Sequence, residues 1–228
     1  MNENLKYVSQ NARITFRCEC CGRCCRNLEN ALMVDPMDIF NLSKYLREQG
    51  GEILGPEDML ARYAHPELLD GCYPIFQRNA EGEDHACVFL KDGRCSVYEA
   101  RPQVCRMYPF GAEPDERGRD FNYYLCTEQP HHFTDRSVKV KDWLGANYSK
   151  ESREFLKAHY QALPVLGKAI RSLGEQGYKR LMFKILYYLY FGYDLEKPFL
   201  PQYQANIAAL METIAGEVRE EDDESCTP

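Results

Sequence analysis

The second half of the chain repeats apolar residues at helical spacing. The pattern predicts helices over residues 137–147, 149–173, 177–191 and 201–219. Pro164 falls inside the second helix and predicts a kink, because proline lacks the backbone N–H that an interior helical position donates. The sequence therefore indicates a helical half from about residue 137 to about residue 220.

Two shorter helices are predicted in the first half. Asp35-Pro36 supplies an N-cap and a first-turn proline, the apolar residues that follow recur at helical spacing, and Gly50-Gly51 ends the helix. A second helix is expected over residues 56–64. Both are interpreted as packing elements rather than as carriers of chemistry.

Short strands are predicted around these helices. Residues 14–16, 73–77 and 121–126 have the composition of strands, whereas residues 1–13 are polar and unpatterned. Residues 87–90 and 95–98 flank Asp92-Gly93, a dipeptide that favours tight hairpin turns, and therefore predict a β-hairpin. A short helix entered through Pro102 should then carry Cys105.

These elements predict an α+β fold. We expect a small cysteine-rich, metal-bound unit with β-hairpins and short helices, followed by a helical C-terminal half. The expected domains are residues 1–135 as the cysteine-cluster metal-binding unit, 137–220 as a helical unit packed on it, and 217–228 as an acidic disordered tail.

The densest chemistry lies between Cys18 and Cys25, where five of eight residues are cysteine. Cys18, Cys21 and Cys24 have the C-x2-C-x2-C spacing that opens a bacterial ferredoxin motif. The fourth position of that motif is Leu28, so a cluster bound here would need a thiolate from elsewhere or from Cys25. Gly22 is free to adopt a positive φ, which lets the loop turn around sulfur.

Further cysteines follow in the middle of the chain. The predicted metal ligands are Cys18, Cys21, Cys24, Cys25, Cys87, Cys95, Cys105 and Cys126. Eight thiolates suit two four-cysteine sites, or one cluster and one zinc. We expect Cys105 or Cys126 to complete the Cys18–Cys24 centre, with the remaining thiolates forming a second one. His131 and His132 follow Cys126 closely and could line the site.

Composition narrows the class of protein. A formal net charge of −7 lacks the basic excess that nucleic-acid binding needs, so no nucleic-acid partner is predicted. Residues 1–17 lack the apolar run of an export signal, and the run over 181–191 is too short to span a membrane. We therefore expect a cytoplasmic protein without a membrane segment. In that reducing compartment its 11 cysteines are better explained as ligands or redox groups than as disulfides.

The cysteine pattern also resembles a known family. The first motif consists of Cys18, Cys21, Cys24 and Cys25, and the second of Cys87, Cys95, Arg101, Pro102, Cys105, Arg106 and Pro109. With these motifs the chain is similar to the CxxCxxCC, or YkgJ-type, cysteine cluster proteins, which are described as zinc- or iron-chelating. Cys20 is an addition to the family pattern. The cluster segment is also similar to one in flagellin lysine N-methylases, which are longer proteins.

Several functions fit this sequence. We favour an iron–sulfur protein, with a 4Fe–4S cluster and a redox or cluster-supported role. The alternatives are a zinc-stabilised structural or interaction module, an S-adenosylmethionine-dependent enzyme resembling the protein lysine N-methylases, and a thiol–disulfide enzyme. A protein or redox partner is compatible with all of them. The sequence leaves open whether the chain is an enzyme and what substrate it would have.

Overall fold

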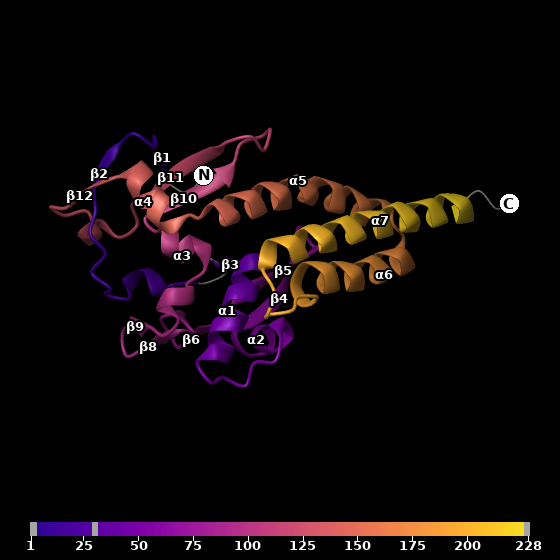
Figure 1. Cartoon of the computed structure of the whole chain (residues 1–228), viewed down its shortest axis with the longest axis horizontal. Helices are drawn as coiled ribbons and strands as arrows, with labels where there is room; N and C mark the ends of the chain where they lie inside the picture. Colours follow the sequence, from indigo (N-terminus) through magenta and orange to yellow (C-terminus); the bar gives the residue numbers. More distant parts are fainter. Residues whose placement is uncertain (1–3, 29–31, 226–228) are drawn as a thin grey trace. The chain divides into compact units, whose positions relative to one another are not determined.

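The structure is a computed structural model that describes residues 4–28 and 32–225 (Figure 1). Helices and small antiparallel sheets alternate along the chain, which confirms the predicted α+β class. The chain divides into two compact units, each made of two separate stretches. Unit 1 is Met1–Leu32 with Asn79–Lys157, and unit 2 is Met33–Arg78 with Ala158–Pro228.

These boundaries differ from the contiguous division near residue 136 that the sequence predicts. Residues 33–78 belong to the same compact unit as the late helices, because their helices α1 (Pro36–Glu48) and α2 (Pro56–Tyr63) contact the π-helical segment η4 (Leu186–Phe191). Independent folding of residues 1–135 and 137–220 stays a prediction.

Unit 1 contains two larger pairings of antiparallel strands. One sheet has the order β1-β11-β10, with β1 (Leu5–Tyr7), β11 (Phe121–Cys126) and β10 (Phe110–Pro114), and β2 (Arg13–Thr15) pairs with β12 (Ser137–Lys139). The strands predicted near 14–16 and over 121–126 are thus present. β1 lies in the segment whose sequence is polar and unpatterned. Its side chains are all exposed, so no apolar pattern marks it, and backbone pairing with β11 holds the strand in place.

The apolar core of unit 1 lies between this sheet and two helices, α3 (Gln103–Met107) and α4 (Val140–Asn147). Its buried members are Met107, Phe110, Phe121, Tyr123, Val140, Leu144 and Tyr148. The Trp143 indole donates a hydrogen bond of 3.1 Å to the Met107 carbonyl and joins the two helices. The helix predicted from residue 137 starts only at Val140, because residues 137–139 pair with β2 instead.

The cysteine-bearing part of unit 1 consists of very short elements. These are η1 (Arg23–Cys25), β6 (Ala80–Glu81), β7 (Ala86–Cys87), β8 (Leu90–Lys91), β9 (Arg94–Cys95), η2 (Tyr98–Ala100) and η3 (Pro130–His132). Asp92 and Gly93 have φ angles of 50° and 74°, as the predicted tight turn requires. The hairpin they close is shorter than predicted: Cys95 pairs with Leu90, whereas Cys87 lies opposite Ala80 in a separate hairpin.

Unit 2 combines a three-stranded antiparallel sheet with helices. The strand order is β3-β5-β4, with β3 (Met33–Val34), β5 (Tyr73–Arg78) and β4 (Ala64–Leu69). Helices α1 and α2 and strand β5 lie where the sequence predicts them. Asp35 caps α1, since its Oδ1 accepts a hydrogen bond of 2.8 Å from the Asp38 backbone N–H.

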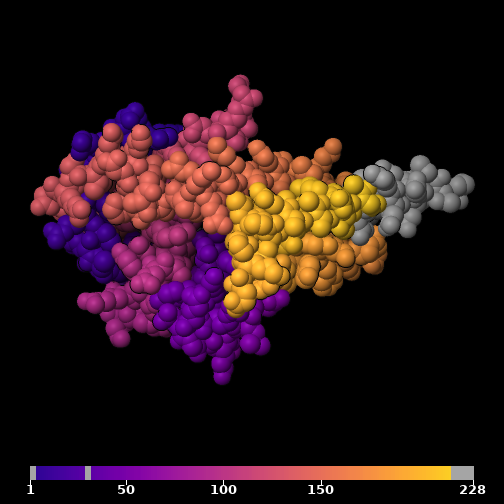
Figure 2. All heavy atoms as spheres, viewed as in Figure 1, coloured from indigo at the N-terminus to yellow at the C-terminus, as the bar shows by residue number. Residues whose placement is uncertain are grey.

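The later helices of unit 2 also follow the predicted spacing. They are α5 (Lys150–Ser172), which begins in unit 1, α6 (Glu175–Ile185), and α7 (Phe199–Ser225). Figure 1 and Figure 2 show α6 and α7 side by side, and the two helices are in contact. Pro164 lies inside α5, which continues to Ser172. α7 extends into the tail predicted to be disordered, and residues 226–228 lie outside the described residues.

Candidate metal centre

The loop that carries the first cysteines has a backbone that depends on glycine. Cys20 and Gly22 have positive φ angles of 52° and 70°, which turn the chain sharply before the short helix η1. A Cβ added to Gly22 would lie only 3.0 Å from the Gly93 carbonyl oxygen and 3.0 Å from the Leu90 side chain. Glycine at this position therefore lets the loop pack directly on the β8–β9 turn, where Cys95 lies.

The end of the same loop is fixed by the segment that precedes Cys87. Asn27 donates a backbone hydrogen bond of 2.8 Å to the Asp84 carbonyl, and Leu28 donates one of 3.1 Å to the His85 carbonyl. The Arg26 guanidinium also pairs with the Asp84 carboxylate. These contacts hold the loop against the segments that bear two of the later predicted ligands, Cys87 and Cys95.

Cys24 interacts with both near and distant cysteines. A hydrogen bond from the Cys25 thiol lowers the pKa of Cys24, while burial and the nearby thiolates of Cys105, Cys18 and Cys21 oppose that shift. The net pKa of Cys24 lies below its ordinary value. The structure thus brings Cys105, on α3, to the C-x2-C-x2-C loop.

A second set of thiols surrounds Cys95. Burial raises the pKa of this thiol, and the neighbouring Cys25 and Cys87 raise it further, against a hydrogen bond from the Val97 backbone and the charge of Arg101. Cys87 is buried and Cys25 and Cys95 are half-buried, whereas Cys18, Cys21 and Cys24 are exposed. Cys25, Cys87 and Cys95 therefore form a more enclosed set beside the exposed loop.

Tyr108 shows where the last predicted ligand lies. Burial raises the pKa of its hydroxyl well above the ordinary value, and the nearby thiolates of Cys126 and Cys24 add to the shift. Cys126 ends strand β11 and pairs across the sheet with Leu5. The predicted strand therefore brings Cys126 near Tyr108, whose pKa Cys24 of the loop also affects.

Two histidines converge on Cys21. The Cys21 Sγ atom lies 3.4 Å from Nε2 of His131 and 3.2 Å from Nε2 of His132. These three donor atoms all lie within 4.8 Å of one another, a grouping that could hold a metal ion. Both histidines belong to the short helix η3, whose turn is closed by backbone hydrogen bonds and contains Pro130.

His132 is buried and contacts several residues of unit 1. Its side chain is 2% exposed, and Nδ1 lies 3.0 Å from the Tyr108 hydroxyl oxygen. The Phe16 ring packs edge-on against the imidazole, and the His132 carbonyl accepts a hydrogen bond of 2.9 Å from the Arg17 backbone N–H. Burial lowers the pKa of His132, and the adjacent His131 lowers it further.

The histidine pair is the main feature of the site that the list of eight cysteine ligands omits. The sequence indicates only that His131 and His132 could line the site, because they follow Cys126 by a few residues. Their contact with Cys21 joins residues 110 and 111 positions apart, which no local pattern encodes. Cys72, by contrast, lies in unit 2 and is not among the predicted ligands.

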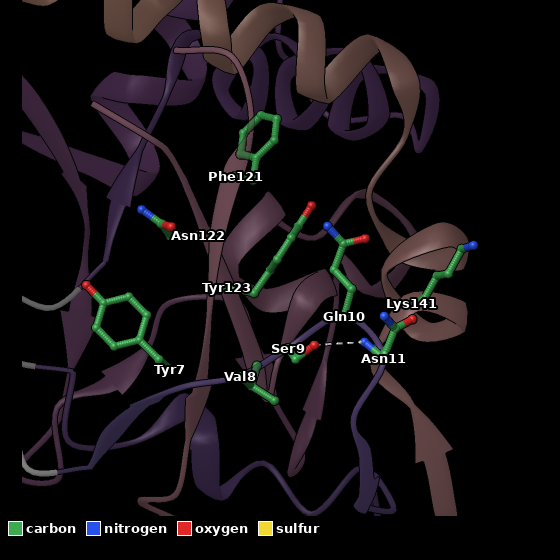
Figure 3. Close-up of a pocket in the computed structure, with 9 residues that line it drawn as sticks. All are labelled: Tyr7, Val8, Ser9, Gln10, Asn11, Phe121, Asn122, Tyr123 and Lys141. Atoms are coloured by element: carbon green, nitrogen blue, oxygen red, sulfur yellow. Dashed lines mark hydrogen bonds between the residues drawn. The ribbon is translucent and has the colours of Figure 1, made fainter. Parts of the chain in front are cut away.

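Unit 1 also has a groove of about 700 Å³ away from the sulfur atoms. Its lining comes from β1, the loop after it, β11 and α4, and consists of Tyr7, Val8, Ser9, Gln10, Asn11, Phe121, Asn122, Tyr123 and Lys141 (Figure 3). None of the eight predicted ligands lines this groove. The chemistry that the sequence indicates is therefore concentrated in the cysteine and histidine cluster.

The donor set defines the class of protein. Thiolate sulfur and imidazole nitrogen are the ligands of zinc and of iron–sulfur centres, whereas magnesium and calcium prefer oxygen. The described cluster supplies both donor types within a small α+β unit. These features define a cysteine-rich metal-binding protein.

The comparison with family models agrees with this class. Residues 17–127 match the model named CxxCxxCC, whose description is "Putative zinc- or iron-chelating domain". The resemblance predicted from the two cysteine motifs is thus confirmed for this segment, which ends shortly before His131. The similarity to flagellin lysine N-methylases is not shown by this match. No solved structure matches the chain.

Among the described residues, none of the helices combines the length and the apolar composition that a membrane span needs.

Proposed function

We propose that the cysteine cluster binds an iron–sulfur centre, favoured as 4Fe–4S, and that the chain has a redox or cluster-supported role. The observation that carries this proposal is the environment of Cys24, whose pKa responds to Cys18 and Cys21 in its own loop and to the distant Cys105. With Cys24 these make four thiols, the number that a cubane cluster requires, and this supports the proposal.

The ligand assignment follows from these neighbours. Cys18, Cys21 and Cys24 would hold three corners of the cluster, and Cys105 or Cys126 the fourth. Cys105 is a candidate because its thiolate raises the pKa of Cys24. Cys126 is a candidate because its thiolate and that of Cys24 both raise the pKa of Tyr108. When bound, an iron–sulfur cluster accepts and donates single electrons.

Cys25, Cys87 and Cys95 would form a second set of ligands. They neighbour one another around Cys95, and Cys25 is also hydrogen bonded to Cys24. Arg101 lies near both sets, since its positive charge lowers the pKa of Cys18 and of Cys95 against the effect of burial. A cation near both groups of thiolates would offset part of their mutual repulsion.

Exposure of the first set supports a redox role. Cys18, Cys21 and Cys24 are exposed, so a cluster bound to them would lie close to the protein surface. A partner protein could then exchange electrons with the cluster. The net charge of −7 favours a protein partner over nucleic acid.

A zinc site is the second candidate, and one observation favours it. Cys21, His131 and His132 bring one sulfur and two nitrogens together, and mixed cysteine and histidine sets are common ligands of structural zinc. In that case the metal would stabilise the short elements around it, and no redox step would be required.

Anaerobic purification from iron-replete cells tests the proposal. We expect a brown protein that contains iron and acid-labile sulfide, absorbs broadly near ~400 nm, and bleaches on reduction. Cys20→Ser is the matched control and should keep this colour, because Cys20 lies outside the regular spacing. A colourless protein with stoichiometric zinc would overturn the iron–sulfur proposal and support the zinc module.

A further inference from the structure

We propose that His131 and His132 donate N–H···S hydrogen bonds to the Cys21 sulfur and so raise the reduction potential of the centre, with Tyr108 as a positioning residue that orients His132. This inference rests on the proposed iron–sulfur function, which it deepens by naming residues that regulate the same site. The two histidines lie beyond the segment matched by the family model, whereas Cys21 and Tyr108 lie within it.

The distances and a count of protons support donation by the histidines. Nε2 of His132 and Nε2 of His131 lie 3.2 Å and 3.4 Å from the same Sγ atom. A neutral thiol has one proton and can give it to one of the two nitrogens, so a hydrogen bond between the sulfur and the other nitrogen requires that nitrogen to donate. A metal-bound cysteine is a thiolate without a proton, and then both nitrogens are donors.

The same distances suit hydrogen bonds to the sulfur. Both separations have the length expected of an N–H···S hydrogen bond. Cys24, Cys18 and Cys105 also supply enough nearby thiols to complete a cluster with Cys21, so imidazole ligands are not needed.

Tyr108 determines which nitrogen of His132 carries the proton. A neutral imidazole has one N–H, and its position follows from the hydrogen bond that the other nitrogen makes. The Tyr108 hydroxyl lies 3.0 Å from Nδ1 and can donate to it, which leaves the proton on Nε2 facing Cys21. The edge-on Phe16 ring and the backbone hydrogen bond from Arg17 keep the imidazole in that orientation.

The effect on the centre follows from charge. Reduction adds an electron to a cluster that is already surrounded by thiolates, and hydrogen bonds to the sulfur atoms stabilise the more negative state. Two such bonds on Cys21 therefore raise the reduction potential. Loss of either bond should lower it.

Redox titration of variants tests this inference. We expect His131→Leu to shift the one-electron reduction equilibrium about tenfold toward the oxidised state, a fall of ~59 mV, with iron and sulfide content unchanged. His132→Leu should shift it in the same direction. His132→Gln should restore most of the potential, because the glutamine amide nitrogen can occupy the place of Nε2 and donate. His65→Leu, in unit 2, is the matched control and should leave the potential unchanged.

Tyr108→Phe tests the positioning step separately. This variant keeps the aromatic ring that packs against His132 and removes only the hydroxyl. We expect an intact cluster and a smaller fall in potential than in His132→Leu. His132 still has a proton to donate, but without the Tyr108 hydroxyl on Nδ1 that proton is no longer held on Nε2. A potential equal to that of the wild type would exclude the positioning role.

Two results would overturn the hydrogen-bond inference while leaving the cluster in place. The first is an unchanged potential in His131→Leu, which tolerates substitution better because His131 is only half-buried. The second is loss of metal from the histidine variants together with strong hyperfine coupling between the cluster and ¹⁵N-labelled histidine. That result would identify the imidazoles as ligands.

Failure of the proposed function gives a different signature. If the protein as isolated holds zinc, the iron–sulfur proposal fails, but ¹⁵N NMR of labelled histidine still decides between donor and ligand. A protonated Nε2 on both histidines supports the hydrogen bonds, and a metal-bound Nε2 overturns them.

Discussion

The cysteine-bearing part of unit 1 and the interior of unit 2 differ in what can stabilise them. Unit 2 buries long apolar side chains from helices and sheet, among them Ile39, Leu42, Met59, Leu166, Leu181, Ile185, Leu189 and Leu210. The cysteine-bearing part instead consists mainly of strands of two residues and single helical turns, and its buried apolar side chains among the described residues include Val88, Phe89 and Val97 near Cys87.

This difference follows from what each type of element can bury. A long amphipathic helix presents a continuous apolar stripe, and each fully buried leucine contributes roughly 1.5–3 kcal/mol. Two-residue strands offer no such stripe, and an isolated short hairpin is at best marginally stable in water. We therefore expect unit 2 to be stable through its core alone and the cysteine-bearing part to depend on bonds from sulfur to a metal.

Removal of a metal ligand should have the largest effect, because it should destabilise the cysteine-bearing part and leave unit 2 folded. Structural metals contribute about 10–16 kcal/mol to the folding of small zinc-binding peptides near neutral pH. We therefore expect Cys21→Ser or Cys105→Ser to lower the metal content per chain and to expose the amides of residues 18–28 and 80–107 to hydrogen exchange. Amides of residues 36–78 should keep their protection, because they belong to unit 2.

Cys72→Ser provides the matched control for this experiment. Cys72 is half-buried in unit 2, where its carbonyl accepts a hydrogen bond from Tyr178. Its substitution should leave the metal content unchanged. The ligand assignment is wrong if Cys21→Ser and Cys105→Ser both retain full metal content and normal protection of the cysteine-bearing segments.

Truncation of a core leucine in unit 2 should give the opposite result. Leu42 lies on α1 and has no exposed surface, so Leu42→Ala should destabilise unit 2 by roughly 2–5 kcal/mol through lost burial and the cavity left behind. The metal content should not change. Urea unfolding and metal analysis measure the two properties, and Leu54→Ala, at a side chain that is 86% exposed, should change neither by a measurable amount. Loss of metal from Leu42→Ala would show that the two regions are not stabilised separately.

The sequence predicts most helices because their signal is local. Asp35, Pro36 and the following apolar spacing mark α1, and α2 and β5 also lie where predicted. β1 has no such signal, since its three side chains are exposed and its pairing partner β11 lies more than a hundred residues away. The assignment of residues 33–78 to the late helices is likewise a matter of distant packing.

The candidate site was predictable to a similar degree. The C-x2-C-x2-C spacing and the Asp92-Gly93 turn are local features of the sequence. The spacing marks the first cysteine loop, and the turn marks the hairpin that carries Cys95. Convergence of His131 and His132 on Cys21 depends on the path of the chain through Phe16, Arg17 and Tyr108. The adjacent histidines shortly after Cys126 were the one available signal, and it could not specify which cysteine they contact.

A pH titration should sharpen the comparison through His159, a buried histidine of unit 2. Burial lowers the pKa of His159 to about 4, below the value of about 6.5 in an unfolded chain, and its Nδ1 lies 3.1 Å from the Tyr203 hydroxyl. Between pH 4 and pH 6.5 the unfolded state therefore binds more protons than the folded state does. Stability from neutral His159 is therefore complete above pH 6.5 and is lost as the pH falls toward 4, by up to about 3 kcal/mol.

His159→Gln isolates this contribution, because glutamine does not titrate. The free energy of unfolding should be measured between pH 4 and pH 7 for both proteins, with hydrogen exchange of α5 amides after residue 158 as the probe of unit 2. The wild type should lose more stability on acidification than the variant. Equal slopes for the two proteins would show that His159 does not remain neutral in the folded state.

The smallest expected effect concerns the start of α1. The Asp35 carboxylate accepts a hydrogen bond from the Asp38 backbone N–H, which has no partner within the helix, and it lies at the positive end of the helix dipole. Asp35→Ala should therefore destabilise unit 2 by about 1 kcal/mol, and Asp35→Asn should recover part of the loss because it keeps the acceptor without the charge. Urea unfolding of both variants measures this difference. Because unit 2 is stabilised by its own core, neither substitution should change the metal content. A loss of metal in Asp35→Ala would show that the two regions are not stabilised separately, even though the capping hydrogen bond contributes little.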